Sequence, residues 1–178
     1  MADITVLIVD DQPLMLHALK TFIENEDGVS VVGTAEDGEA AVEAAKALEP
    51  DLVLMDIKMP RLNGIEATRK IVSEIPGTRV LALTTFSTLD YVVPALRAGA
   101  AGYLVKDARP DEILAAIRNA MDDSLPLSPS VVRLMARQVI GGALDTQAVA
   151  GASATEVGLA PREISVLQFL GNGLSNRE

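Results

Sequence analysis

Several features that define other protein classes are missing from this 178-residue chain. It contains no cysteine, which excludes disulfides, thiolate metal sites and thiol nucleophiles together. The N-terminus, Met-Ala-Asp-Ile-Thr-Val, has neither a basic start nor a long apolar run, so neither a signal peptide nor a membrane span is apparent. These absences favour a cytoplasmic protein that does not act at a membrane.

Positive charge is also scarce, because 15 Lys and Arg residues face 25 Asp and Glu residues. The excess lies in the first part of the chain, where 11 basic residues face 20 acidic ones up to Asp122. Contacts to nucleic-acid phosphates need Lys and Arg, so this acidic part is not a nucleic-acid reader. A nucleotide-driven enzyme is poorly supported as well, since the pattern G-x-x-x-x-G-K-[ST] is absent.

Five short apolar runs recur along the chain, and helical segments lie between them. The runs occupy residues 4–9, 29–34, 51–56, 79–84 and 102–106. The helical segments occupy residues 13–25, 39–48, 64–75, 91–98 and 110–121. The runs are continuous rather than alternating, as in parallel sheets that are covered on both faces. This pattern predicts an α/β fold of five βα units, for which we expect the flavodoxin-like strand order 2-1-3-4-5.

Polar residues follow four of the five runs. The first ends at Asp10 and Asp11, the third at Asp56, the fourth at Thr84 and the fifth at Lys106. In this strand order the first and third strands are neighbours, so three carboxylates should meet at the carboxyl edge of the sheet. Thr85 is an alternative to Thr84, but strand alternation and the spacing to the lysine favour Thr84.

Three carboxylates that lie this close repel one another unless a cation joins them. Magnesium prefers oxygen ligands and commonly uses one or two carboxylates together with a phosphate. An aspartate can itself attack phosphorus and hold an aspartyl-phosphate. A lysine would then neutralise the phosphoryl oxygens, and a threonine hydroxyl could bond one of them. The edge is therefore predicted to be a magnesium-dependent phosphoryl site.

Four segments resemble the receiver domain of bacterial two-component response regulators. They are Asp10-Asp11, D-I-K-M-P-R-L-N-G at 56–64, L-T-T-F at 83–86 and G-Y-L-V-K-D at 102–107. The resemblance implies that Asp56 accepts a phosphoryl group from a sensor histidine kinase. It also implies that Mg²⁺ is held by Asp10, Asp11, Asp56 and the backbone carbonyl of Lys58, while Lys106 contacts the phosphate.

The resemblance also implies a switch pair, Thr84 and Tyr103. The hydroxyl of Thr84 would move toward the phosphoryl group, and the ring of Tyr103 would turn inward. A packing role on an edge strand is a second interpretation of Tyr103, and both roles can hold. The family further implies homodimerisation on activation, for which residues 89–96 and 113–121 are candidate faces, with ordinary core packing as the alternative.

Three further segments, including the end of the chain, indicate a subfamily of the response regulators. Residues 28–38 and 96–107 resemble the NarL/FixJ subfamily, and residues 159–178 are similar to the opening of its LuxR-type helix-turn-helix domain. We therefore predict a receiver at 1–122, a linker at 123–158 with one helix at 128–140, and an incomplete all-α domain at 159–178. A capping box formed by Ser175 and Glu178 announces a helix where the sequence ends. We expect a truncated regulator that lacks its recognition helix, so the full-length protein would bind DNA but this piece would not.

An enzyme is the competing hypothesis. Mg²⁺-dependent phosphatases that form an aspartyl-phosphate carry the pattern D-x-D, in which the first Asp is the nucleophile and the second is the general acid. Here the position two residues after Asp56 is Lys58, so that acid is missing. Outside this site, Asp37, Glu39 and Glu43 read as a solvated charged face of a helix. We therefore predict a signalling switch rather than an enzyme.

Overall fold

The computed structural model describes residues 3–122 and 124–145 of the chain, with side chains up to residue 138. The chain divides into two units between Ser128 and Pro129. The predicted LuxR-type segment at 159–178 and its capping box lie outside the described residues, as does the predicted linker from residue 146 to 158.

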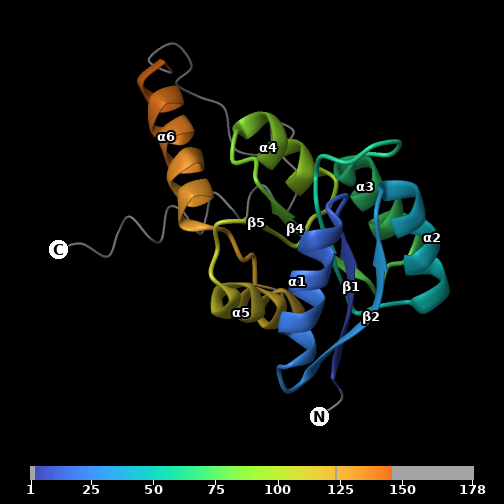
Figure 1. Cartoon of the computed structure of the whole chain (residues 1–178). Coiled ribbons are helices and arrows are strands. Elements are labelled where there is room, and N and C mark those ends of the chain that lie inside the picture. The colour runs from blue at the N-terminus through green and yellow to red at the C-terminus, as the bar shows by residue number, and fades with distance from the viewer. Residues whose placement is uncertain (1–2, 123, 146–178) are drawn as a thin grey trace. The chain divides into compact units, whose positions relative to one another are not determined.

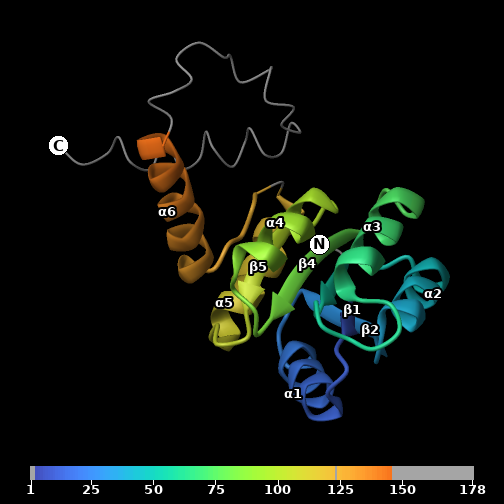
Figure 2. The ribbon, with the colours of Figure 1, turned by 90° about the horizontal axis from the view of Figure 1, so that it is seen from above.

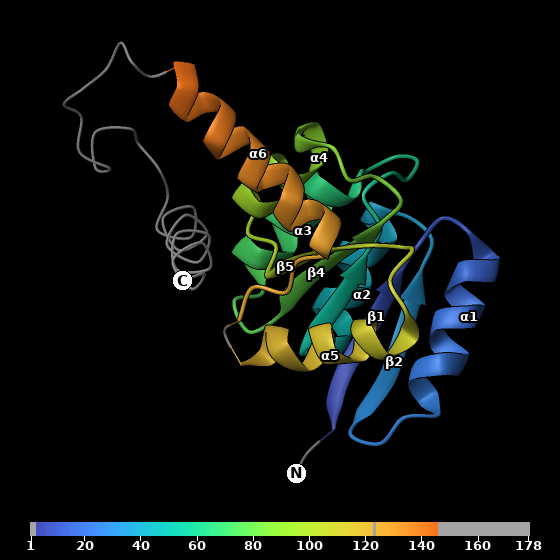
Figure 3. The same ribbon diagram turned by 90° about the vertical axis from the view of Figure 1, so that its left-hand side faces the viewer.

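The first unit is built on a five-stranded sheet. Its strands are β1 (Ile4–Val9), β2 (Val29–Ala35), β3 (Leu52–Met55), β4 (Arg79–Thr84) and β5 (Gly102–Val105). All neighbouring pairs are parallel and the order is β2-β1-β3-β4-β5, so β2 and β5 lie at opposite edges (Figures 1 and 3). The predicted fold class and strand order are confirmed.

Helices cover both faces of this sheet, as the continuous apolar runs predict (Figure 2). One face carries α1 (Pro13–Glu24) and α5 (Pro110–Met121), and the other carries α2 (Gly38–Leu48), α3 (Gly64–Glu74) and α4 (Leu89–Arg97). Each face has its own apolar core. Within the candidate dimer face at 113–121, Ile113, Leu114 and Ile117 are buried in the core of the first face, which is the ordinary packing alternative.

The helix ends show why the elements begin where they do. Both α1 and α5 open with a proline, whose fixed φ suits the first helical position. Asn63 caps α3 by accepting a hydrogen bond from the Glu66 N–H at 3.0 Å. In contrast, α4 has no side-chain cap and contains Pro94 in its interior, where proline removes a helical hydrogen bond. By its local sequence, α4 is the least well supported helix beside the sheet.

Residues 125–128 lie along the open edge of β5. The backbone N–H of Tyr103 donates to the Pro126 carbonyl at 2.9 Å, and the Ser128 N–H donates to the Tyr103 carbonyl at 3.0 Å. The Val105 N–H donates to the Ser128 hydroxyl, also at 3.0 Å. A Cβ atom at Gly102 would stand 2.5 Å from the Pro126 carbonyl oxygen, so this close approach requires glycine. The first unit thus extends beyond the predicted end at 122, and its edge strand is covered by residues that the sequence assigned to the linker.

The described part of the second unit is the helix α6 (Pro129–Asp145). It overlaps the helix predicted at 128–140 and continues into Gly141–Asp145, which the sequence pattern assigned to a flexible linker. Two glycines there weaken a helix, but they do not end it. Among the described residues, no helix is both long and apolar enough to cross a membrane.

Candidate functional site

Three carboxylates meet at the carboxyl edge of the sheet, as predicted. Val9 and Met55 are register partners in the β1–β3 pair, so Asp10 and Asp56 both follow directly on paired positions. The Asp56 N–H donates to the Val9 carbonyl at 2.9 Å, which continues the ladder by one residue. Ligand oxygens of Asp10, Asp11 and Asp56 all lie within 4.8 Å of one another. Asp10 and Asp56 are buried and Asp11 is exposed, so the cluster opens to solvent on one side.

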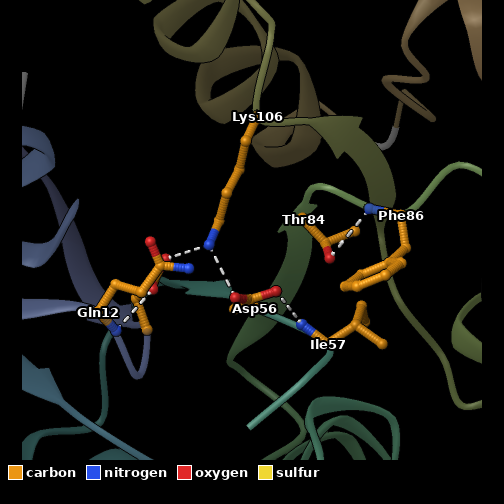
Figure 4. Close-up of polar contacts among 7 residues, drawn as sticks. Gln12, Asp56, Ile57, Thr84, Phe86 and Lys106 are labelled. Carbon is orange, nitrogen blue, oxygen red and sulfur yellow. Dashed lines mark hydrogen bonds and ion pairs between the residues drawn. The ribbon is translucent and has the colours of Figure 1, made fainter.

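Lys106 reaches two of these carboxylates, and dashed lines in Figure 4 join its side-chain nitrogen to both. Its Nζ lies 2.6 Å from Oδ2 of Asp10 and 2.7 Å from Oδ2 of Asp56. All three side chains are at most 5% exposed. The remaining oxygens have backbone donors, since the Gln12 N–H lies 3.0 Å from Oδ1 of Asp10 and the Ile57 N–H lies 2.6 Å from Oδ1 of Asp56. Every charge in this buried cluster therefore has a partner, which makes its burial tolerable.

The pKa values of the buried pair show how the charges are balanced. Burial raises the pKa of Asp10 above its ordinary value of 3.8, although hydrogen bonds from Lys106 and the Gln12 N–H act to lower it. Burial also disfavours the charged form of Lys106, but hydrogen bonds to Asp10 and Asp56 outweigh it and raise the pKa of Lys106 above 10.5. Lys106 therefore stays protonated and positively charged, and Asp10 takes up a proton more readily than an ordinary aspartate.

Thr84 and Tyr103 meet at the loop that follows β4. Thr84 is fully buried and Thr85 is exposed, which agrees with the preference for Thr84. The Phe86 N–H donates to the Thr84 hydroxyl over a long 3.4 Å (Figure 4), and the Tyr103 hydroxyl donates to the Phe86 carbonyl at 2.6 Å. The ring of Tyr103 is fully buried. Burial, together with the negative charge of Asp56, raises the pKa of its hydroxyl, so Tyr103 is neutral and remains a donor.

The side chain of Lys58 is directed away from the carboxylates and onto two aromatic rings. Its ammonium lies 4.1 Å from the ring centroid of Phe86 and 5.2 Å from that of Tyr91, and the two rings are 5.1 Å apart. Such cation–π contacts hold a flexible lysine in one direction. The loop after β3 is therefore attached through Lys58 to the loop after β4 and to α4.

Comparison with known proteins identifies this arrangement. The model of the response regulator receiver domain matches residues 6–118, which is more than half of the chain. The chain belongs to the response regulator receiver family. The nitrate/nitrite response regulator protein NarL of Escherichia coli (strain K12) is 32% identical over 173 residues, which cover 97% of this chain and 77% of NarL. The predicted family is thus confirmed.

Two solved receiver structures agree with this assignment. A two-component response regulator of the LuxR family from Aurantimonas sp. SI85-9A1 is 30% identical with a TM-score of 0.74, and the match covers 78% of this chain and 99% of that one. The CheX-CheY-BeF3-Mg²⁺ complex from Borrelia burgdorferi contains a chain that is 30% identical with a TM-score of 0.62. That match covers 66% of this chain and 89% of the other. The similarity to NarL and to a LuxR-family regulator agrees with the predicted subfamily.

The receiver also contains contacts that the sequence did not indicate. Asp37 was assigned to a solvated helix face with Glu39 and Glu43, and this was wrong for Asp37, which is buried, caps α2 and pairs with Arg61. Glu39 and Glu43 are exposed as expected. The signal that was available is the position of Asp37 just before a helical segment, where aspartate is a preferred cap. The pairing with Arg61 has no counterpart in local sequence, because the two residues come from different loops.

The donor set at the receiver's acidic edge fits a hard divalent cation. Three carboxylates offer only oxygen ligands, and one ammonium neutralises only one of their charges. Magnesium is bound by such oxygen donors, usually by one or two carboxylates with water completing the shell. Asp11 faces solvent and has no ammonium partner among the ion pairs of the described residues, so its oxygens would be accessible to an ion from solvent.

Proposed function

We propose that this receiver accepts a phosphoryl group on Asp56 from a sensor histidine kinase and thereby switches a transcription regulator. The observation that carries the proposal is the convergence of Asp10, Asp11, Asp56 and Lys106 at one edge of the sheet. An oxygen of Asp56 would attack the phosphorus of a phosphohistidine, a new O–P bond would form, and the N–P bond would break as the imidazole leaves.

The residues that would hold Mg²⁺ are Asp10, Asp11, Asp56 and, through its backbone carbonyl, Lys58. When bound, the ion would offset negative charge on the phosphoryl oxygens. The protein's own contribution is the ammonium of Lys106, which already lies 2.7 Å from Asp56 and can contact a phosphoryl oxygen attached there. A buried lysine of this kind stabilises charge without having to be brought in from solvent.

Thr84 and Tyr103 would report the phosphoryl group to the rest of the domain. The 3.4 Å bond from the Phe86 N–H to the Thr84 hydroxyl is weak, so that hydroxyl can be drawn toward a phosphoryl oxygen. The hydroxyl of Tyr103 donates to the carbonyl of the same residue, Phe86. A movement of Thr84 would therefore shift Phe86 in the β4–α4 loop and, through its carbonyl, the hydrogen bond of the Tyr103 hydroxyl.

The output would be exerted by the full-length protein. We propose that phosphorylation favours a homodimer, and that sequence-specific DNA binding resides in a LuxR-type domain of which residues 159–178 are the beginning. The NarL relative and the LuxR-family neighbour are response regulators by name, which supports this output in a cytoplasmic two-component system.

A Mg²⁺-dependent phosphatase is the weaker alternative. Such an enzyme needs an acid near the nucleophile to protonate the leaving group. The position two residues after Asp56 carries Lys58, whose ammonium is directed onto the rings of Phe86 and Tyr91. The site therefore favours a stable phosphoryl acceptor over turnover of phosphate esters.

Beryllofluoride with Mg²⁺ tests the proposal. The wild-type chain should bind it, and the oligomeric state followed by light scattering should shift toward the dimer. Asp56→Asn preserves the shape of the side chain but removes the attacking carboxylate, so we expect no response from this variant while its circular dichroism stays native. An equal response from both proteins would show that Asp56 is not the acceptor. Incubation with acetyl phosphate should likewise add one phosphoryl group to the intact mass of the wild type only.

A further inference from the structure

Asp37 and Arg61 form an ion pair outside the carboxylate cluster. Oδ1 of Asp37 accepts hydrogen bonds from the N–H groups of Glu39 at 2.8 Å and Ala40 at 2.9 Å, which caps α2. The other oxygen, Oδ2, pairs with the guanidinium of Arg61. The aspartate side chain is 3% exposed and the arginine side chain is 60% exposed. One carboxylate thus serves two purposes, and only one of them concerns the helix.

The loop that carries Arg61 is the one that leaves the site after Asp56. Its base is closed by the Gly64 N–H, which donates to the Ile57 carbonyl at 2.9 Å. The Gly38 N–H donates to the Leu62 carbonyl at 3.1 Å, and a Cβ atom at Gly38 would stand only 2.3 Å from that oxygen. The first turn of α2 therefore packs directly against the loop, and the ion pair lies beside this contact.

Arg61 adopts a conformation that arginine seldom takes. Its φ is +62°, in the left-handed region, where a Cβ atom costs about 1–2 kcal/mol. Such a conformation persists only where the surroundings hold it. The pair with buried Asp37 is a contact that can do so, because it fixes the guanidinium from the α2 side. On the other side, the loop is held by the cation–π contacts of Lys58.

We propose that Asp37 and Arg61 are positioning residues that hold the β3–α3 loop so that the Lys58 carbonyl faces the magnesium site. The inference rests on the Mg²⁺ site of the proposed function and adds to it the contact that sets the geometry of the ligand supplied by the backbone of the β3–α3 loop. Mg²⁺ demands nearly ideal octahedral geometry, so a displaced carbonyl is costly. Loss of a contact that orients a metal ligand typically weakens binding by about 10-fold to 100-fold.

Two substitutions remove the pair while sparing the rest of the structure. Asp37→Asn keeps a good helix cap, since the amide oxygen can still accept from the Glu39 and Ala40 N–H groups. Arg61→Gly removes the guanidinium and suits a positive φ better than arginine does. A double variant tests whether both act through the same contact, because the second change should then add nothing.

The two variants also distinguish positioning of the Lys58 carbonyl from a change in the electrostatic potential at the Mg²⁺ site. Asp37→Asn removes a negative charge, and Arg61→Gly removes a positive one. A general field would therefore weaken Mg²⁺ binding in the first variant and strengthen it in the second. Positioning predicts that both variants bind more weakly, with Kd raised about 10-fold in each and to the same level in the double variant.

The experiment is an isothermal titration of the full chain with MgCl₂, without any phosphodonor, with thermal unfolding recorded for each protein. Lys46→Met is the matched control, because it breaks a 2.8 Å ion pair between α2 and Glu74 of α3 and leaves the loop untouched. We expect its Kd to equal that of the wild type. Asp37→Asn and Arg61→Gly should both weaken binding. If Asp37→Asn failed to fold, Arg61→Gly alone would decide, because positioning and a general field predict opposite shifts for it. If Arg61→Gly failed to fold, Arg61→Asn would replace it, since it removes the same charge and asparagine also tolerates a positive φ.

Two results would overturn the inference alone: opposite shifts of Kd in the two variants, or values within about twofold of the wild type while Asp11→Asn loses binding. A lower melting temperature with unchanged Kd belongs to the same group, since it would indicate a purely structural pair. In contrast, a wild type that binds no Mg²⁺, or an Asp11→Asn variant that binds as well as the wild type, would overturn the metal site itself.

Discussion

Replacing Lys106 by methionine should destabilise the receiver strongly in the absence of a divalent cation. Methionine keeps most of the length and the apolar stem of the side chain, so packing changes little. The ammonium that lies 2.6 Å from Asp10 and 2.7 Å from Asp56 is lost, however. Two buried carboxylates then face each other with no cation between them.

The size of the effect follows from two limits. Removing one partner of a buried ion pair costs about 3–5 kcal/mol. The carboxylates can escape by protonation, and at pH 7 this costs a group of ordinary pKa 3.8 about 4.4 kcal/mol, at 1.36 kcal/mol per pH unit. Asp10 is the group that would take the proton, because burial already raises its pKa. We therefore expect the free energy of unfolding to fall by about 3–4 kcal/mol at pH 7.

The pH dependence of the stability deficit in Lys106→Met shows whether the unpaired carboxylates cause it. In the variant, the pKa of Asp10 in the folded state rises further above its unfolded value. Such a group destabilises the fold above the unfolded pKa, and the penalty shrinks as the pH falls toward that value and is gone below it, where both states are protonated. The difference between wild type and variant should thus shrink as the pH falls toward 3.8. On the alkaline side, the raised pKa of Lys106 means that its contribution persists up to pH 10.5 and is lost only above that value.

Urea denaturation in buffer without divalent cations, with and without added Mg²⁺, measures these differences. Mg²⁺ at 100 times its Kd should restore about 2.7 kcal/mol. Binding should also be tighter in Lys106→Met, since no ammonium competes for Asp10 and Asp56. Lys46→Met, which breaks an exposed pair with Glu74, is the control and should change stability little. A variant as stable as the wild type at pH 7, or a deficit that does not shrink in acid, would refute the reasoning.

Three further substitutions test the covered edge of the sheet and the switch residue by urea denaturation. Gly102→Ala places a Cβ atom 2.5 Å from the Pro126 carbonyl oxygen and should cost about 1–3 kcal/mol, whereas a neutral result would show that residues 125–128 do not pack there. Ser128→Ala leaves the buried Val105 N–H without its acceptor, so we expect a loss of about 1–3 kcal/mol and faster hydrogen exchange of that amide; unchanged exchange would contradict the contact. Tyr103→Phe removes one hydrogen bond and should cost about 1 kcal/mol, while a stabilised variant would argue against its inward position.

The residues that sequence reasoning could place are those whose position follows from strand order. Asp10, Asp56, Thr84 and Lys106 each follow a continuous apolar run, and parallel strands bring their carboxyl ends to one edge. The order 2-1-3-4-5 then makes β1 and β3 neighbours, which explains the carboxylate cluster. No side-chain contact had to be known for this prediction, because the strands themselves supply the geometry.

The contacts that sequence reasoning missed are those between loops. Nothing periodic connects Lys58 with Phe86 and Tyr91, or Asp37 with Arg61, since these contacts join segments that are far apart in the sequence. The strand-like pairing of residues 125–128 is too short to show an alternation, so Pro126 and Ser128 read as a break.

Charge balance at the acidic edge sets the condition for phosphorylation. When all three carboxylates are ionised, three negative charges face the single positive charge of Lys106, which leaves a local charge of −2. A phosphoryl dianion that approaches Asp56 meets this charge, and at about 4 Å each pair of like unit charges costs about 4 kcal/mol near a protein surface. If Asp10 and Asp11 hold a divalent cation, the local charge becomes zero and that repulsion is lifted. Lys106 alone offsets too little of it, so we expect beryllofluoride to bind the wild type only when Mg²⁺ is present, and binding without the ion would show that the carboxylates are not ionised as the geometry implies.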